Sequence, residues 1–389
     1  RILGPHHPDT LATRNNLASA YQAAGRLDDA ITLYESTLKT QIDTLGADHP
    51  GTLITRNNLA SAYWDAGRIE EAIALYEQNL EDRTRILGPH HPDTLITRNN
   101  LASAYQAAGR LDDAITLYES TLKTQIDTLG ADHPGTLITR NNLASAYWDA
   151  GRIEEAIALY EQNLEDRTRI LGPHHPDTLA SQHNLAGAYR DAGRIEEAIA
   201  LHEQNLEDRT RILGPHHPDT LASHHNLAGA YRDAGRLDDA ITLHKQNLKD
   251  RTRILGPHHP DTLIARNNLA GAYRDAGRLD DAITLHKQNL KDRTRILGPH
   301  HPDTLIARNN LAGAYRDAGR LDDAITLHKQ NLKDRTRILG PHHPDTLATR
   351  NNLADAYRDA GRLDDAITLH KQNLKDRTRI LGPHHPDTL

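Results

Sequence analysis

Two patterns of apolar residues, both with helical spacing, alternate along the chain. The first runs from Leu17 to Ala24, where apolar side chains recur three or four positions apart, as on one face of an α-helix. Pro8 lies ahead of this run and suits the first turn of a helix, because the N–H that proline lacks would be unpaired there. Gly25 follows and is typical of a helix end. The pattern predicts a helix over about residues 8–24.

The second pattern begins after a short break. Apolar side chains from Leu27 to Leu45 lie on one side of a helix. Asp28 stands in the first turn, where negative charge favours the helix dipole, and Gly46 follows the last apolar residue. These signals predict a second helix over about residues 27–45. No stretch alternates apolar and polar residues with period two, so no strand is predicted.

This pair of predicted helices returns every 42 residues. The glycine that ends the second helix stands at Gly4, Gly46, Gly88, Gly130, Gly172, Gly214, Gly256, Gly298, Gly340 and Gly382. A fixed period of about 20 to 50 residues is typical of solenoids and other repeat arrays. The chain is therefore predicted to be a single all-α array rather than two or three globular domains. The nine repeats are 1–42, 43–84, 85–126, 127–168, 169–210, 211–252, 253–294, 295–336 and 337–378, with a partial tenth repeat at 379–389.

The repeats are copies of one another to an unusual degree. Residues 1–84 and 85–168 differ only at Ala12 versus Ile96, and residues 251–292 and 293–334 are identical. This hierarchy favours recent duplication over a designed consensus, although the narrow alphabet, which lacks Cys, Met, Phe and Val, fits both. The chain has no initiator Met and both ends fall inside a repeat, so we expect a fragment of a longer array. The absence of cysteine fits a reducing, cytoplasmic compartment.

The net charge of −7 is unevenly spread. Residues 1–168 hold 14 Lys/Arg and 24 Asp/Glu, a balance of −10, whereas residues 169–389 hold 32 and 29, a balance of +3. A nucleic-acid surface needs a strongly basic face, so no nucleic-acid partner is predicted. No apolar run is long enough to span a membrane, and neither a signal peptide nor a membrane partner is predicted.

The repeat resembles the tetratricopeptide repeat in the 42-residue form found in kinesin light chains. The resemblance is carried by the run Asn15-Asn16-Leu17-Ala18 and by Tyr21, Gly25, Ala30, Leu38, Leu45-Gly46 and His49-Pro50. It implies an α-α superhelix, a right-handed solenoid of helical hairpins, with a concave groove lined by the first helix of each repeat. It also implies binding of extended peptides or partner proteins. Similar arrays occur in bacterial signalling ATPases, which are a plausible parent.

Two positions depart from the pattern of that family. Arg14, which becomes Gln182 and His224 in later copies, stands where the family has a large apolar residue. Tyr34 stands at an inward position of the second helix, and in repeats five to nine histidine replaces it at His202, His244, His286, His328 and His370. A buried histidine resists charging, which lowers its pKa in the folded protein. Acid sensitivity is therefore predicted for the C-terminal half of the array.

A second stripe on the first helix is predicted to face water or a ligand. It contains Ala12, Asn15, Asn16, Ser19, Gln22 and Ala23, opposite the apolar face. One asparagine of the stripe is present in all nine repeats, at Asn16, Asn58, Asn100, Asn142, Asn184, Asn226, Asn268, Asn310 and Asn352. A carboxamide both donates and accepts, so this ladder could hold the backbone of an extended peptide. Alternatively, each asparagine bonds the neighbouring first helix and holds the stack together.

The stripe also has a variable position. It holds Gln22, Trp64, Gln106 and Trp148, and then Arg190, Arg232, Arg274, Arg316 and Arg358. Tryptophan and arginine are favoured at binding hot spots, so Trp64, Trp148 and the five arginines are predicted peptide-binding residues, the arginines taking ligand carboxylates. Alternatively, each arginine pairs with the acidic residue that follows it. The glycines of this stripe, such as Gly187 and Gly313, either admit a ligand backbone or serve close packing.

No feature of the sequence predicts catalysis or a cofactor. Adjacent histidines such as His6 and His7 precede the first helix of every repeat except repeats two and four, which read Ala47-Asp48-His49 and its copy. Such a pair rarely converges on one ion, and nothing completes a metal site. They are interpreted as part of a loop at the helix start. The prediction is a non-enzymatic, cytoplasmic scaffold that binds a protein or peptide. The alternative is a spacer or self-association module, because the apolar faces at the two ends could stack head to tail and propagate.

Overall fold

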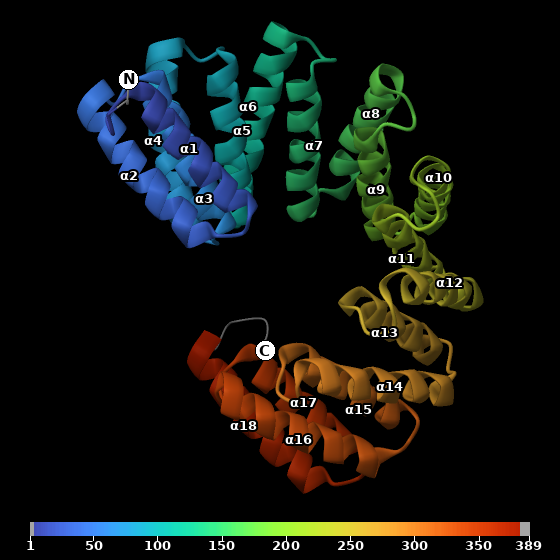
Figure 1. Ribbon diagram of the computed structural model, residues 1–389. Coiled ribbons are helices and arrows are strands. Elements are labelled where there is room, and N and C mark those ends of the chain that lie inside the picture. The colour runs from blue at the N-terminus through green and yellow to red at the C-terminus, as the bar shows by residue number, and fades with distance from the viewer. Residues whose placement is uncertain (1–3, 382–389) are drawn as a thin grey trace. The chain divides into compact units, whose positions relative to one another are not determined.

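The computed structural model describes residues 4–381, and this part of the chain consists of eighteen α-helices without a strand (Figure 1). The odd-numbered helices, called A helices below, are α1 (Pro8–Ala23), α3 (Pro50–Asp65), α5 (Pro92–Ala107), α7 (Pro134–Asp149), α9 (Pro176–Asp191), α11 (Pro218–Asp233), α13 (Pro260–Asp275), α15 (Pro302–Asp317) and α17 (Pro344–Asp359). The even-numbered B helices are α2 (Leu27–Leu45), α4 (Ile69–Leu87), α6 (Leu111–Leu129), α8 (Ile153–Leu171), α10 (Ile195–Leu213), α12 (Leu237–Leu255), α14 (Leu279–Leu297), α16 (Leu321–Leu339) and α18 (Leu363–Leu381).

The all-α prediction is confirmed, and the helix bounds lie within one residue of those expected for the first repeat. Within each unit the A helices pack on the B helices that follow them, as α1 on α2 and α11 on α12, and α1 and α5 also contact the next A helices, α3 and α7. The chain forms two compact units, one up to Ala198 and one from Ile199, with the boundary inside α10. Each unit is a solenoid of stacked helical hairpins. The partial tenth repeat, 379–389, lies beyond the described residues except for its first three.

Each A helix begins at a proline and is capped by the histidine before it. His7 has extended backbone, and its Nδ1 accepts the N–H of Asp9 at 3.2 Å. The same hydrogen bond recurs at His49, whose Nδ1 accepts the N–H of Gly51 at 3.1 Å. A side-chain acceptor at this position satisfies one of the N–H groups that a helix start leaves unpaired. The second histidine of the His-His-Pro run therefore has a structural role.

A glycine turns the chain from the A helix to the B helix. Gly25 has φ +72°, a left-handed conformation that costs glycine little. The turn lets Arg26 N–H bond Tyr21 O at 2.9 Å and Gly25 N–H bond Gln22 O at 3.0 Å, which closes the end of the helix. The short connection brings the B helix back against the A helix and starts the hairpin.

The core lies between the two helices of one repeat and the A helix of the next. Ala18, Ala30, Ile31 and Tyr34 are buried together with Leu59 of the following repeat. The small alanines let the helices approach, and the larger side chains fill the space between repeats. Because each repeat is covered by its neighbour, the chain ends differ: Leu17 of α1 is 47% exposed, whereas its counterpart Leu59 is 3% exposed.

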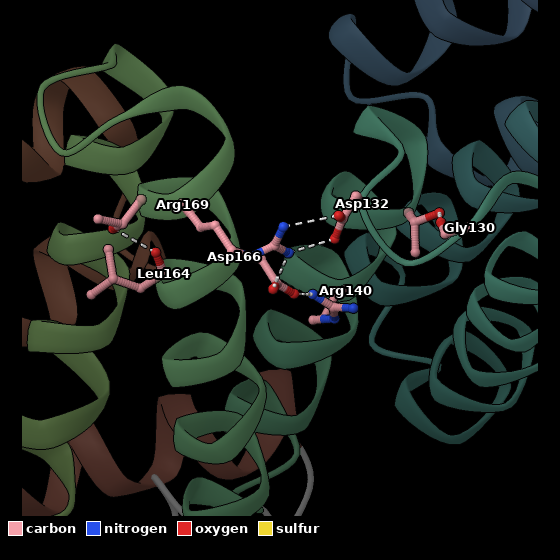
Figure 2. Close-up of polar contacts among 8 residues, drawn as sticks. Gly130, Asp132, Arg140, Leu164, Asp166 and Arg169 are labelled. Atoms are coloured by element: carbon pink, nitrogen blue, oxygen red, sulfur yellow. Dashed lines mark hydrogen bonds and ion pairs between the residues drawn. The ribbon is translucent and has the colours of Figure 1, made fainter.

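The arginine that departs from the family pattern is buried in an ion pair. Arg140 is 2% exposed, and its Nη1 lies 2.6 Å from Asp166 Oδ2 on α8 (Figure 2). Asp166 also accepts from Arg169 at 2.9 Å, and Arg169 reaches Asp132 in the loop before α7 at 2.6 Å. This network joins the loop, the A helix and the B helix of one repeat. The same buried pair recurs at Arg56–Asp82, Arg266–Asp292, Arg308–Asp334 and Arg350–Asp376.

Candidate binding surface on the A helices

In each unit the predicted stripe lies on one surface, here called the A-helix surface. It is defined by Ala12, Asn15, Asn16, Ser19, Gln22, Ala23 and their counterparts. These residues line shallow clefts between successive A helices. One cleft of about 360 Å³ has Ala12, Asn15 and Asn16 in its wall with Ile54 of the next repeat. The surface also carries a row of exposed isoleucines at the counterparts of Ala12. They are Ile54, Ile96, Ile138, Ile264 and Ile306, each exposed by 46 to 51%.

The asparagine ladder forms hydrogen bonds between neighbouring repeats. In each described pair, Nδ2 of the ladder asparagine donates to the first asparagine of the preceding A helix. The bonds are Asn58–Asn15 at 3.5 Å, Asn100–Asn57 at 3.4 Å, Asn142–Asn99 at 3.4 Å, Asn184–Asn141 at 3.1 Å, Asn310–Asn267 at 2.9 Å and Asn352–Asn309 at 3.0 Å. Asn268 instead contacts His225 Nδ1 at 3.2 Å. The ladder is thus a seam along the stack, while Asn16, Asn58, Asn142, Asn226 and Asn268 also line clefts.

The variable position reaches across to the next A helix, 39 and 43 residues further on. Gln22 Nε2 donates to Ser61 Oγ at 3.2 Å and to Asp65 Oδ2 at 2.6 Å. Gln106 repeats this with Ser145 at 3.1 Å and Asp149 at 2.6 Å. A neutral carboxamide satisfies the hydrogen-bonding capacity of the carboxylate only in part and leaves its charge unbalanced.

The five arginines at this position meet carboxylates. Arg274 pairs with Asp317 of the next A helix, and Arg316 lies 3.5 Å from Asp359. Arg232 lies 3.4 Å from the adjacent Asp233. Arg190 and Arg358 likewise contact the acidic residues that follow them, Asp191 at 3.3 Å and Asp359 at 3.4 Å. The arginines therefore neutralise the aspartates of the A-helix surface in the later repeats.

The two tryptophans occupy equivalent positions in different surroundings. Trp148 packs over Gly187, where an added Cβ would come within 2.5 Å of the ring, and its Nε1 donates to Asp191 at 2.9 Å. Its ring also meets Tyr160 edge to face at 6.3 Å. Trp64 has Ser103 and Ala107 at the corresponding positions and is 42% exposed. Its Nε1 donates no hydrogen bond within residues 4–381.

Two clefts of the first unit have the same lining, 84 residues apart. The first, of about 370 Å³, is lined by Ser19, Gln22, Ala23, Tyr34, Asn58, Ser61 and Asp65. The second, of about 310 Å³, is lined by the seven counterparts Ser103, Gln106, Ala107, Tyr118, Asn142, Ser145 and Asp149, together with Trp64. No cation lines either cleft.

Tyrosine and histidine share one buried position behind this surface. Tyr118 is 1% exposed, its hydroxyl lies 2.6 Å from Ser103 Oγ, and burial raises its pKa to about 12. His286 and His328 are 3% and 2% exposed, and their Nδ1 atoms have no hydrogen-bond partner. Burial, and secondarily the arginine on the adjacent A helix, lowers the pKa of each to about 4. The predicted inward position is thus confirmed for His202, His244, His286 and His328, which are buried, but it is wrong for His370, whose side chain is 40% exposed because no described helix packs over the last B helix.

Other histidines of the described residues contact arginines or cap helices. The first histidine of the later loops contacts an arginine at the end of the B helix: Arg295 Nη2 lies 2.7 Å from His258 Nε2. In repeats two and four an aspartate takes that place, as in Asp132–Arg169. Across the described ranges, no group of three or more His, Cys, Asp or Glu side chains could hold a metal ion. Among residues 4–381 no helix has the length and apolar character needed to cross a bilayer.

Comparison with known proteins places these features in a family. A 42-residue stretch, 11% of the chain, is 55% identical to the kinesin light chain-related protein 2 of Arabidopsis thaliana and spans 6% of that protein. A solved structure of a putative kinesin light chain from Podosopora anserina, with nearly identical TPR-like repeats, is 35% identical. It covers 53% of the chain and 97% of its own length, with a TM-score of 0.50. The apo form of RapI shares the fold at 12% identity, with a TM-score of 0.61, 95% of this chain and 98% of its own covered.

A family model described as tetratricopeptide repeat matches the chain eight times in overlapping segments. The segments are residues 9–81, 52–127, 96–165, 135–204, 180–246, 221–290, 261–332 and 303–374. Together they span nearly the whole chain, and each covers close to two of the 42-residue repeats. The chain belongs to the tetratricopeptide repeat family.

Proposed function

We propose that the protein is a non-enzymatic, cytoplasmic scaffold that binds extended segments of partner proteins on its A-helix surface. The observation that carries this proposal is the exposed isoleucines on successive A helices within one unit: Ile54, Ile96 and Ile138, with Trp64, in the first unit, and Ile264 and Ile306 in the second. The other residues of the surface are small or polar. Isolated apolar side chains are common on protein surfaces, whereas a contiguous apolar row flanked by polar groups is typical of interaction sites. Small residues in the same stripe leave room for a peptide backbone.

The asparagine ladder contributes to this proposal in a limited way. Nδ2 of Asn142 is used in the bond to Asn99, but Oδ1 keeps its capacity to accept an N–H from a bound main chain. A peptide carboxylate at Arg274 would have to compete with Asp317. The proposal therefore relies more on repeats one to four, where the variable position is neutral, than on the arginine repeats.

A display library of random peptides, selected against the full chain, tests the proposal. Ile96→Lys on the A-helix surface is the test variant, since Ile96 is 51% exposed and its replacement leaves the core intact. Ile126→Lys is the matched control, because Ile126 is 41% exposed on the B helix α6. Selected peptides should lose affinity for the first variant and keep it for the second. Equal affinity for both variants would place the binding site elsewhere.

Self-association is the second candidate, because apolar residues are exposed on terminal helices of both units. Leu363, Ile367 and Leu374 of α18 are 56%, 49% and 53% exposed, whereas Ile325, the counterpart of Ile367, is 4% exposed. In α1, Leu17 is exposed, whereas its counterpart Leu59 is covered by the preceding repeat. A second copy could stack its α1 on α18, and such a contact propagates.

Sedimentation over a range of concentrations separates the two candidates. For self-association, the average mass should rise with concentration and return to that of a monomer in the variant Ile367→Lys. A monomer at every concentration would remove this candidate and leave peptide binding.

A further inference from the structure

We infer that the cleft between Trp64 and Asp149 binds a lysine or arginine side chain of an extended partner segment. This inference rests on the proposed function and assigns a chemical class of ligand to one site in the first unit. The cleft combines an exposed aromatic ring from α3, the small Ala107 of α5 and a carboxylate from α7. A lysine or arginine side chain suits this combination, because its apolar stem can pack on the ring and the alanine while its charged end approaches the carboxylate.

Among residues 4–381, no cation forms an ion pair with the carboxylate of Asp149. The neutral Gln106 donates a hydrogen bond to this carboxylate, with 2.6 Å between its Nε2 and Oδ2 of Asp149. At the equivalent position of the second unit, Asp317 pairs with Arg274. The sister cleft in the first two repeats has the same unbalanced arrangement, with Gln22 on Asp65. In the first unit these aspartates therefore attract a cation, which the later repeats supply from within the chain.

Trp64 provides the second half of the site. From repeat one to repeat eight, an acidic residue stands 43 positions after every other member of the variable position, whereas Ala107 stands 43 positions after Trp64. Its equivalent, Trp148, has its ring on Gly187 and its Nε1 on Asp191. Trp64 makes neither contact, so its ring stays available to a ligand. A cation over an aromatic face is attracted by the ring quadrupole, and the stem of lysine or arginine packs well on an apolar surface.

The negative net charge of the first four repeats also favours a positively charged ligand. The first 168 residues carry 14 Lys/Arg against 24 Asp/Glu, a balance of −10. Such a field raises the local concentration of cationic partners and speeds their association. An acidic segment would meet Asp149 and Asp65 without any cation in the cleft walls.

Three short peptides with blocked ends, identical except for a central lysine, norleucine or glutamate, test the inference by NMR. The 389-residue chain is labelled at the indole nitrogens, which gives one resonance each for Trp64 and Trp148, assigned with Trp64→Phe. The lysine peptide should shift the Trp64 resonance in a saturable, salt-sensitive way and leave Trp148 unchanged. The glutamate peptide should shift neither, and norleucine should bind more weakly than lysine.

Matched variants identify the residues responsible. Asp149→Asn keeps the shape of the side chain and should weaken lysine binding about two- to fivefold, the range that exposed ion pairs reach. Asp65→Asn, in the sister cleft that lacks the tryptophan, should leave the affinity unchanged. Equal responses to lysine and norleucine, or an unaltered affinity in Asp149→Asn, would overturn the inference. Peptides from the library that depend on Ile96 but carry no basic residue near Trp64 would overturn it too, while leaving the proposed function intact.

Discussion

Repeats one to four and repeats six to eight have the same helical hairpins but differ in the side chains at one buried position of the B helix and at the A-helix positions next to it. In the early repeats a buried tyrosine such as Tyr118 reaches Ser103 across the hairpin. In the later ones His286 stands at the tyrosine position and Gly271 at the serine position, while Arg274 replaces glutamine or tryptophan. The three changes occur together. The hydrogen bond between two hydroxyl groups is lost, and His286 has no hydrogen-bond partner at Nδ1. The neutral side chain on the surface is replaced by Arg274, which forms an ion pair with Asp317.

The difference shows how a solenoid can acquire pH sensitivity without a change of fold. Tyr118 stays neutral at any physiological pH, because burial raises its pKa to about 12. His244, His286 and His328 have pKa values lowered to about 4. The folded pKa lies below the unfolded value of about 6.5, so the fold favours the neutral form. The resulting stability is complete above that value and is lost as pH falls from about 6.5 toward 4.

The largest expected effect is therefore an acid-induced loss of stability in the later repeats. At pH 5 each buried histidine should cost roughly 2 kcal/mol relative to neutral pH, as follows from a shift of this size. A variant with His244, His286 and His328 changed to Tyr, and with Gly229, Gly271 and Gly313 changed to Ser, should lose much less. Urea unfolding of both full chains at pH 7 and pH 5 measures the difference. Equal losses in the two proteins would show that the histidines do not cause the sensitivity.

The second effect compares the two tryptophans. Trp148→Ala removes the packing on Gly187, the contact with Tyr160 and the hydrogen bond to Asp191, and should destabilise by about 2 to 3 kcal/mol, less than a fully buried tryptophan. Trp64→Ala removes a ring that is 42% exposed and has neither the glycine contact nor the hydrogen bond of Trp148, so it should cost less, about 1 kcal/mol. Urea unfolding at neutral pH compares the variants. A similar cost for both would mean that the surroundings of the two rings are energetically equivalent.

A smaller effect concerns the asparagine ladder. Asn310→Ala and Asn352→Ala each remove a bond of 2.9 or 3.0 Å to the preceding A helix. Each should cost about 0.5 to 1.5 kcal/mol, the net value of an ordinary hydrogen bond, partly offset because alanine favours the helix more than asparagine does. A peptide from the library should also bind less tightly to Asn142→Ala if Oδ1 holds its main chain. Lower stability with unchanged peptide affinity would make the ladder a seam alone.

The helices could be predicted from the sequence because their signals are local. Pro8 and the apolar spacing lie within one helix and Gly25 lies two residues after it, so the bounds agree to one residue. The Arg140–Asp166 pair was missed, although a signal existed: repeats with arginine at this position and aspartate 26 residues later are repeats two, four and seven to nine. Repeats one and three have threonine there, and Arg14 bonds Ser36 instead. The fit of Trp148 on Gly187 could not be predicted, because it depends on how two A helices lie side by side.

The smallest expected effect separates the two kinds of glycine in the A helices. A Cβ at Gly187 would lie 2.5 Å from the Trp148 ring, whereas a Cβ at Gly271 would have no heavy atom within 4 Å. Gly271→Ala should therefore stabilise by about 0.5 to 1 kcal/mol, the usual gain of alanine over glycine inside a helix. Gly187→Ala gains the same propensity but displaces the ring from Asp191 and Tyr160, so its net effect should be destabilising by about 1 kcal/mol. Urea unfolding gives the sign of each change, and Trp148→Ala provides the control, since Gly187→Ala in that background should become stabilising. If Gly187→Ala stabilises the parent chain, the glycine is not needed to make room for the Trp148 ring. Space for a ligand would then be the remaining reason for a glycine at this position.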